Sequence, residues 1–73
     1  MLNAKYLLSK AKFVNNLLYF GELYSAKDIR KIMNDLGIKM NSKLFNEVLV
    51  VARTYDVIYH DKSVAIHYIY WRK

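Results

Sequence analysis

The sequence contains no cysteine and no proline, and it has two glycines in 73 residues. Without cysteine the chain has neither disulfides nor zinc sites built from thiolates, and it suits a reducing cytoplasm. Without proline, no sharp boundary between elements is marked. The sequence also lacks a run of roughly 18 apolar residues, the length that a membrane span requires. Its start, MLNAKYLLSKAK, interrupts leucines with lysines and lacks a cleavage site. We therefore expect a soluble, cytoplasmic protein with no membrane partner.

A chain of 73 residues makes one domain. Folding buries only about 60% of the surface that so short an unfolded chain exposes, so small domains are usually supplemented by disulfides, a metal ion or a second subunit. Hydrophobic residues make up 55% of the chain and aromatic residues 15%, which is more than a compact body of this size can bury. The composition therefore predicts a homodimer.

Acidic residues are scarce: six Asp and Glu stand against twelve Lys and Arg, which gives a formal net charge of +6. An excess this large in so short a chain predicts a polyanionic partner. The alternative is that the charge merely keeps a small basic domain in solution.

The strongest periodic pattern runs from Asn41 to Tyr55 and predicts a helix, with Asn41 or Ser42 as its cap. Apolar residues recur at spacings of three and four, and they form a broad stripe that we expect to be buried. The stripe contains Leu44, Phe45, Val48, Leu49, Val51, Ala52 and Tyr55, and the opposite face contains Lys43, Asn46, Glu47, Val50, Arg53 and Thr54.

A first helix is predicted from about Leu2 to Phe20, with Gly21 as its stop, because apolar residues keep a helical period over this range. Its apolar face is wider than two short helices can cover. The excess is either ordinary core or a surface that meets its symmetry mate in a dimer. The candidate dimer surface consists of Tyr6, Phe13, Leu17 and Phe20.

A second helix is predicted to begin at Ser25 and to end at Gly37. Ser25 and Asp28 have the spacing of a capping box, and Gly37 supplies the left-handed residue that closes a helix. The extended link before it has room for a short extra strand near Leu23 and Tyr24. Two helices joined by a short turn that contains glycine form a helix-turn-helix pattern.

After Tyr55 the pattern changes from helical to extended and predicts a β-hairpin that ends near Trp71. If Asp61 and Lys62 form the turn, Tyr59 lies opposite Val64, and Val57 lies opposite Ile66. Both faces of such a hairpin are largely apolar, so the pattern specifies its register weakly.

Chemistry other than binding has little support in the sequence. His60 and His67 lack a third ligand at a useful spacing, so we expect no metal site. Ser25, Asp28 and Asp35 are more simply helix-end residues, and neither a glycine-rich phosphate loop nor a nucleophile with its base is present. We predict no enzymatic activity, no cofactor and no small-molecule ligand.

This order of elements resembles the winged-helix, or winged helix-turn-helix, family of DNA-binding domains, over most of the chain from Phe13 to Tyr70. In size and composition the chain is similar to small transcription regulators of archaea and their viruses, which would place it in the cytoplasm of a cell or of an infected host cell. The family usually has glycine where this chain has Asp56, and its second helix and following turn are usually shorter. The resemblance is carried by Leu17, Leu18, Gly21, Ser25, Ile29, Leu36, Gly37, Phe45, Leu49, Ala52, Asp56 to Ile58, and Tyr68 to Tyr70.

The resemblance implies an α+β domain of three helices and a two-stranded wing that binds double-stranded DNA as a homodimeric transcription regulator. The helix at 41–55 would enter the major groove, with Lys43, Asn46 and Arg53 as candidates for base contacts. Glu47 on the same face would accept from cytosine or hold a neighbouring cation. Candidates for contacts with the DNA backbone are Lys27, Arg30, Lys31, Lys39 and Lys62.

Two other functions stay open from the sequence. Winged-helix folds also serve as protein-protein interaction modules, and the exposed aromatic residues expected here favour that use. Others are RNA-associated, as in some ribosomal proteins, where basic residues interleaved with aromatic ones stack on unpaired bases. A solvated helix face with no ligand is the simplest alternative for the residues opposite the stripe.

Overall fold

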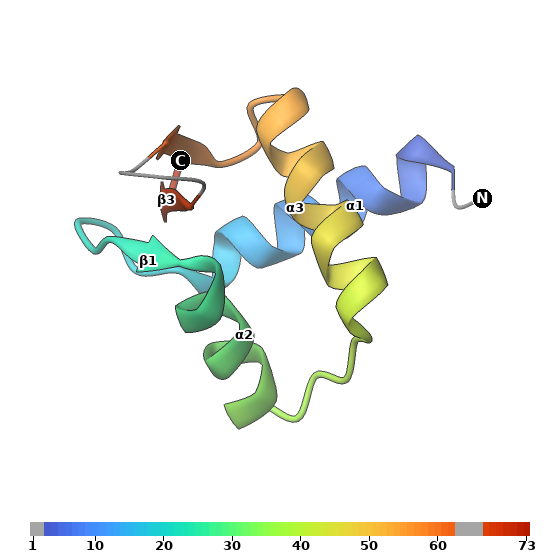
Figure 1. Cartoon of the computed structure of the whole chain (residues 1–73), viewed down its shortest axis with the longest axis horizontal. Coiled ribbons are helices and arrows are strands. Elements are labelled where there is room, and N and C mark those ends of the chain that lie inside the picture. Colours follow the sequence, from blue (N-terminus) through green and yellow to red (C-terminus); the bar gives the residue numbers. More distant parts are fainter. Residues whose placement is uncertain (1–2, 63–66) are drawn as a thin grey trace.

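The computed structural model describes residues 3–62 and 67–73. Three helices precede a C-terminal hairpin, and a short strand ahead of the second helix extends that hairpin to an antiparallel three-stranded sheet with the order β1-β3-β2 (Figure 1). This α+β topology is like that of a winged helix, as expected. The elements are α1 (Ala4–Leu17), β1 (Tyr24–Ser25), α2 (Ala26–Asp35), α3 (Ser42–Thr54), β2 (Tyr59–Lys62) and β3 (Tyr68–Trp71).

Helix α1 ends earlier than predicted. Asn3 caps its start by accepting a hydrogen bond from the Tyr6 N–H at 2.8 Å, and its last helical residue is Leu17. Leu18 is extended and 1% exposed, so the chain leaves the helix where the Leu18 side chain enters the core. The prediction that Phe20 belongs to the helix and that Gly21 stops it is therefore wrong; Gly21, with φ of +85°, lies in the turn that follows. The predicted start at Leu2 lies outside the described residues.

Helix α2 begins with the predicted capping box. The Ser25 hydroxyl accepts from the Asp28 N–H at 3.0 Å, and the Asp28 carboxylate accepts from the Ser25 N–H at 2.9 Å. The hydrogen bond that the Asp28 carboxylate accepts from the Ser25 N–H is the main cause that lowers the pKa of Asp28 below its ordinary value of 3.8. At the other end Gly37 has φ of +73°, and the Ile38 N–H donates to the Met33 carbonyl at 2.9 Å. Gly37 thus closes α2 as expected.

Helix α3 has the predicted bounds, with Asn41 as N-cap and Tyr55 as C-cap. The Asn41 side chain accepts from the Leu44 N–H at 2.8 Å. The closing turn repeats that of α2: the Asp56 N–H donates to the Arg53 carbonyl at 3.3 Å, and the Val57 N–H donates to the Ala52 carbonyl at 2.9 Å. Asp56 takes the left-handed position with φ of +52°, the position that glycine usually takes at the end of a helix.

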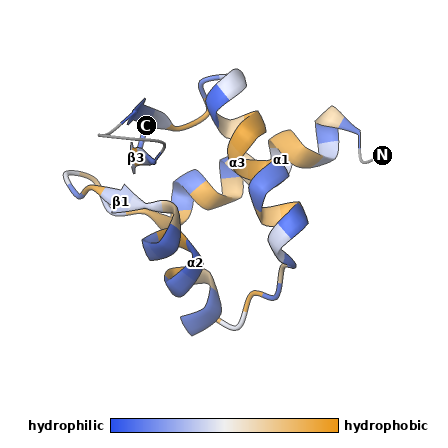
Figure 2. Cartoon of the chain, viewed as in Figure 1, coloured by the Kyte–Doolittle hydropathy of each residue, from blue (hydrophilic) through white to orange (hydrophobic). Residues whose placement is uncertain are grey.

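The core lies where α1 and α3 cross, and α2 and the sheet close it from one side (Figure 1). The hydrophobic middle turns of α3 lie over α1, whereas most of α2 is hydrophilic (Figure 2). Tyr55 departs from the predicted stripe, since it is 55% exposed beyond the last turn of α3. The fully buried residues include Ala11, Val14, Ile29, Met33, Val48 and Ala52 from the helices and Ile58 and Tyr70 from the hairpin region.

The register of the hairpin differs from the prediction. Asp61 and Lys62 belong to β2, and Tyr59 lies opposite Trp71, so the turn placed at Asp61 and Lys62 is wrong. The partners predicted for Tyr59 and Val57, Val64 and Ile66, lie outside the described residues. Tyr59 stacks on Trp71 with ring centroids 5.8 Å apart on one face of the sheet. On the other face Tyr70 is 1% exposed and pairs with Tyr24 of β1, which confirms a short strand in this region.

The C-terminal residues are attached to α1 and do not form a free basic tail. Asn15, the buried polar residue of α1, accepts from the Lys73 N–H at 2.8 Å and donates to the Lys73 carbonyl at 3.3 Å. Arg72 donates to the Leu18 carbonyl at 3.1 Å, and the Lys73 ammonium donates to the Asp56 carbonyl at 2.6 Å. These bonds tie β3 to the helical core.

Candidate nucleic-acid interface

The outer face of α3 presents two of the three predicted base contacts to solvent. Lys43 and Asn46 are exposed, and neither side chain bonds to another described residue. Val50 on the same face is 48% exposed, and the Thr54 hydroxyl donates a hydrogen bond to the Val50 carbonyl at 2.8 Å. Glu47 is half-buried and forms no ion pair with Lys43 or Arg53, so the helical ion pair considered for it is not formed. An exposed cation and an exposed amide therefore share this face.

Arg53, the third predicted base contact, is held by the sheet. Its guanidinium donates to the Tyr70 hydroxyl at 2.7 Å and lies over the Tyr68 ring, 4.2 Å from the centroid. Arg53 is half-buried as a result. Burial raises the pKa of Tyr70 above its ordinary value of 10.0, and the hydrogen bond from Arg53 opposes part of that rise. Tyr70 therefore stays a neutral acceptor for the guanidinium.

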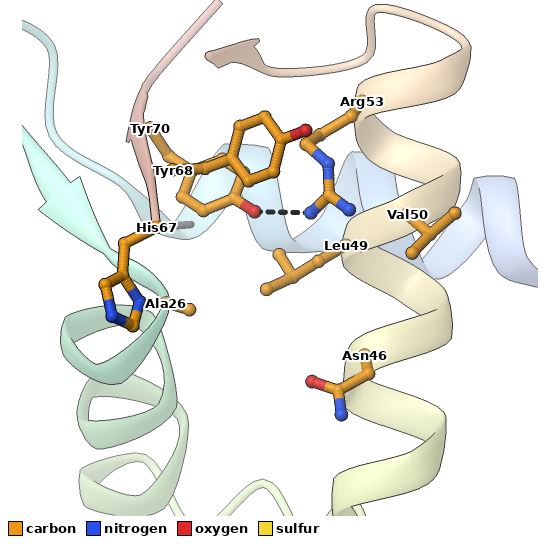
Figure 3. A pocket seen from close by; sticks show the side chains of 8 residues that line it. All are labelled: Ala26, Asn46, Leu49, Val50, Arg53, His67, Tyr68 and Tyr70. Atoms are coloured by element: carbon orange, nitrogen blue, oxygen red, sulfur yellow. Dashed lines mark hydrogen bonds between the residues drawn. The ribbon is translucent and has the colours of Figure 1, made fainter. Parts of the chain in front are cut away.

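A groove of about 250 Å³ opens between α3, the start of α2 and the start of β3 (Figure 3). Arg53 and Asn46 extend into it from α3, and His67 and the tyrosines of β3 face them. No carboxylate belongs to the described residues that line it. These lining residues are Ala26, Asn46, Leu49, Val50, Arg53, His67, Tyr68 and Tyr70.

The predicted backbone contacts do not all lie free on the surface. Lys27, Lys39 and Lys62 are exposed. Lys31 is also exposed, but its ammonium pairs with Asp35 at 3.2 Å. Arg30 is half-buried against Phe45, with its guanidinium 5.1 Å from the ring centroid and one buried nitrogen without a hydrogen-bond partner.

The predicted dimer surface is exposed but spans two segments. Tyr6 and Phe13 on α1 are 42% and 45% exposed, and Leu17 is half-buried. Phe20 is 69% exposed in the turn after α1, where the Arg72 guanidinium lies 4.3 Å from its ring centroid. Sequence reasoning missed Tyr19 and Leu23 in the same turn, since their exposure follows from the early end of α1.

Neither a metal site nor a membrane-spanning helix is found among the described residues. His60 sits on β2 with its ring edge-on to Tyr68, and His67 lies at the groove. Within residues 3–62 and 67–73 no cluster of three or more His, Cys, Asp or Glu is placed to hold a metal ion. In the same residues no helix has both the length and the apolar character to cross a bilayer.

Comparison of the chain with protein-family models, with curated proteins and with solved structures finds no match.

Proposed function

We propose that this protein binds double-stranded DNA in a sequence-specific manner and acts as a homodimeric transcription regulator. The observation that carries the proposal is the outer face of α3, where Lys43 and Asn46 are exposed and have no partner among residues 3–62 and 67–73. An asparagine amide can read adenine and a lysine can read guanine at the edges of base pairs in the major groove. Helix α3 is the element that would enter that groove.

The charge of the chain supports a polyanionic ligand. The chain carries a formal net charge of +6. Lys27 precedes α3 in the helix-turn-helix, Lys39 lies in the turn before it, and Lys62 ends β2; all three are exposed. Such lysines would hold phosphates and set the register of the helix on the duplex.

The exposed aromatic residues support a second subunit. Phe13 on α1 and the 19–23 turn lie on elements other than α3, so a dimer formed there would leave both recognition helices available. A two-fold dimer predicts inverted-repeat sites with half-sites about 34 Å apart or at multiples of that distance.

Selection of bound duplexes from a random library, followed by sedimentation of the protein alone, tests the proposal. Enriched inverted repeats and a two-subunit species are expected. If about six phosphates are neutralised, the logarithm of the binding constant for duplex should fall with a slope of roughly −5 against the logarithm of salt concentration. A chain that enriches no duplex at low salt would refute the proposal.

A protein partner is the second candidate, favoured by the exposure of Tyr19, Phe20 and Leu23 at 77%, 69% and 66%. An apolar protein interface would show little dependence on salt, in contrast to binding through phosphates. An RNA-binding role would appear as stronger binding to single-stranded RNA than to duplex DNA, with Tyr59 and Trp71 as the stacking surface.

A further inference from the structure

We propose, on the basis of the proposed function, that Arg53 binds a DNA backbone phosphate at the groove between α3 and β3, and that Tyr70 positions it. This assigns Arg53 a different role from the base contact that its place on the outer face of α3 predicts. Lys43 and Asn46 keep that role.

The first support is that the guanidinium is fixed before any ligand arrives. Tyr70 accepts one of its N–H groups at 2.7 Å, and Tyr68 stacks against it at 4.2 Å. A guanidinium carries several N–H donors in a rigid fork, so donors remain for a second acceptor. Because both tyrosines belong to β3, the wing sets the direction of this side chain (Figure 3).

The second support is that the charge of Arg53 is not neutralised. The ion pair formed among the described residues joins Lys31 and Asp35, both on α2, and no acidic residue lines the groove. Ala26 also lines the groove, and it is the first residue of α2. Amides in the first turn of a helix have no intrahelical acceptor. Asp28 is not a lining residue; its carboxylate accepts from the Ser25 amide. The groove therefore offers the positive charge and the remaining N–H donors of Arg53 to an anion.

The third support is the position of Arg53 along α3. Residues near the N-terminus of a recognition helix contact the bases. Arg53 lies in the last turn, about two turns or roughly 10 Å beyond Asn46. The major groove is about 12 Å wide. A helix that places Asn46 at the base edges therefore brings Arg53 to the wall of the groove, where the phosphates lie. Figure 3 shows the guanidinium turned toward β3.

Inorganic phosphate tests the site without DNA. In ¹⁵N-labelled protein at constant ionic strength, replacing chloride by phosphate is expected to shift the Arg53 Nε–Hε resonance and the Ala26 amide more than other resonances. Tyr70→Phe keeps the charge and nearly the volume of the site, and it should reduce the Arg53 shift. Equal shifts at all exposed cations, or none at Arg53, would overturn the proposal.

Binding to duplex DNA then distinguishes a phosphate contact from a base contact at Arg53. On preferred and scrambled duplexes alike, Arg53→Ala is expected to weaken binding about tenfold, the loss of one charge-assisted hydrogen-bonded contact. It should also reduce the salt slope by about one. Tyr70→Phe should weaken both duplexes a few-fold with the slope unchanged.

Lys5→Ala is the matched control, since it removes one exposed charge on α1, away from the groove. The affinity of Lys5→Ala for both duplexes should stay close to that of the wild type. A loss from Arg53→Ala confined to the preferred duplex would make Arg53 a base reader and overturn the inference. A wild-type protein that binds no duplex would instead refute the proposed function, and the phosphate titration would still decide whether the groove holds an anion.

Discussion

Asp56 closes α3 in a backbone conformation that usually belongs to glycine. Its φ of +52° lies in the left-handed region, and it takes the same place after α3 that Gly37 takes after α2. A residue with a Cβ atom is strained there, although aspartate tolerates the region better than most.

Replacing Asp56 with glycine should therefore stabilise the protein, by about 0.5 to 1 kcal/mol in the free energy of unfolding. The contact from Lys73 goes to the Asp56 carbonyl, so it survives the change. Gly37→Ala is the opposite case: a Cβ there meets nothing within 4 Å, so the expected loss of about 1 kcal/mol comes from backbone strain alone. Urea unfolding measures the change in the free energy of unfolding for both variants. A change of the same sign in both would contradict these predictions.

Asp28 makes the stability of α2 depend on pH. Its pKa is lowered in the folded state, chiefly by the hydrogen bond from the Ser25 amide. The stabilisation is therefore complete above the ordinary value of 3.8 and is lost as pH falls below it through the folded pKa.

Asp28→Asn should accordingly flatten the fall in stability from about pH 5 to about pH 2. Urea midpoints across this range measure the effect. Asp61→Asn is the control, since the Asp61 carboxylate has no partner among the described residues. An unchanged acid profile in Asp28→Asn would show that the capping box does not carry the pH dependence.

At the scale of elements, α2 and α3 could be predicted closely because local signals mark both their ends. Ser25, Gly37 and Asn41 act within a few residues of themselves, and each takes the place that the sequence predicts. The end of α1 and the register of the wing depend on contacts between distant residues. Leu18 leaves its helix for the core, and Tyr70 pairs with Tyr24. No local pattern contains these contacts.

The link between α1 and the C-terminus is a contact between elements that no sequence pattern predicted. Asn15→Ala removes two hydrogen bonds to Lys73 at a buried site, and it should lower the free energy of unfolding by about 1 to 3 kcal/mol. Asn16→Ala on the exposed side of the same helix should stay within about 0.5 kcal/mol of the wild type. Chemical denaturation measures both, and equal losses would mean that the link does not stabilise the fold.

For the whole molecule, composition predicted more apolar surface than one subunit can hide. The structure places part of the exposed apolar surface on α1 and the 19–23 turn, and Leu36, Val50, Tyr55 and Tyr59 are exposed elsewhere. Composition could not predict that Tyr19 and Leu23 are exposed, because their exposure depends on where α1 ends. The candidate site likewise has residues that could be predicted from the sequence and one whose position could not. Lys43 and Asn46 follow from helical period alone, whereas the position of Arg53 depends on the two tyrosines of β3.

Phe13→Gln should weaken the dimer at least about tenfold, because aromatic residues dominate the energy of such interfaces. Sedimentation equilibrium measures the dissociation constant. Val50→Gln, a comparable change on the outer face of α3, should leave the constant unaltered. A monomeric wild-type protein, or a dimer weakened by Val50→Gln and not by Phe13→Gln, would contradict the assignment of this surface.

The proposed function depends on the outer face of α3 reading duplex DNA. The most direct test is the affinity of the wild type and of Asn46→Ala for the preferred duplex and for a scrambled one, at one salt concentration. Asn46→Ala is expected to lose about 1 to 3 kcal/mol of binding free energy on the preferred duplex and little on the scrambled one. Lys62→Ala in the wing should weaken both alike. Equal losses from Asn46→Ala on both duplexes, or no loss on either, would contradict the proposed function.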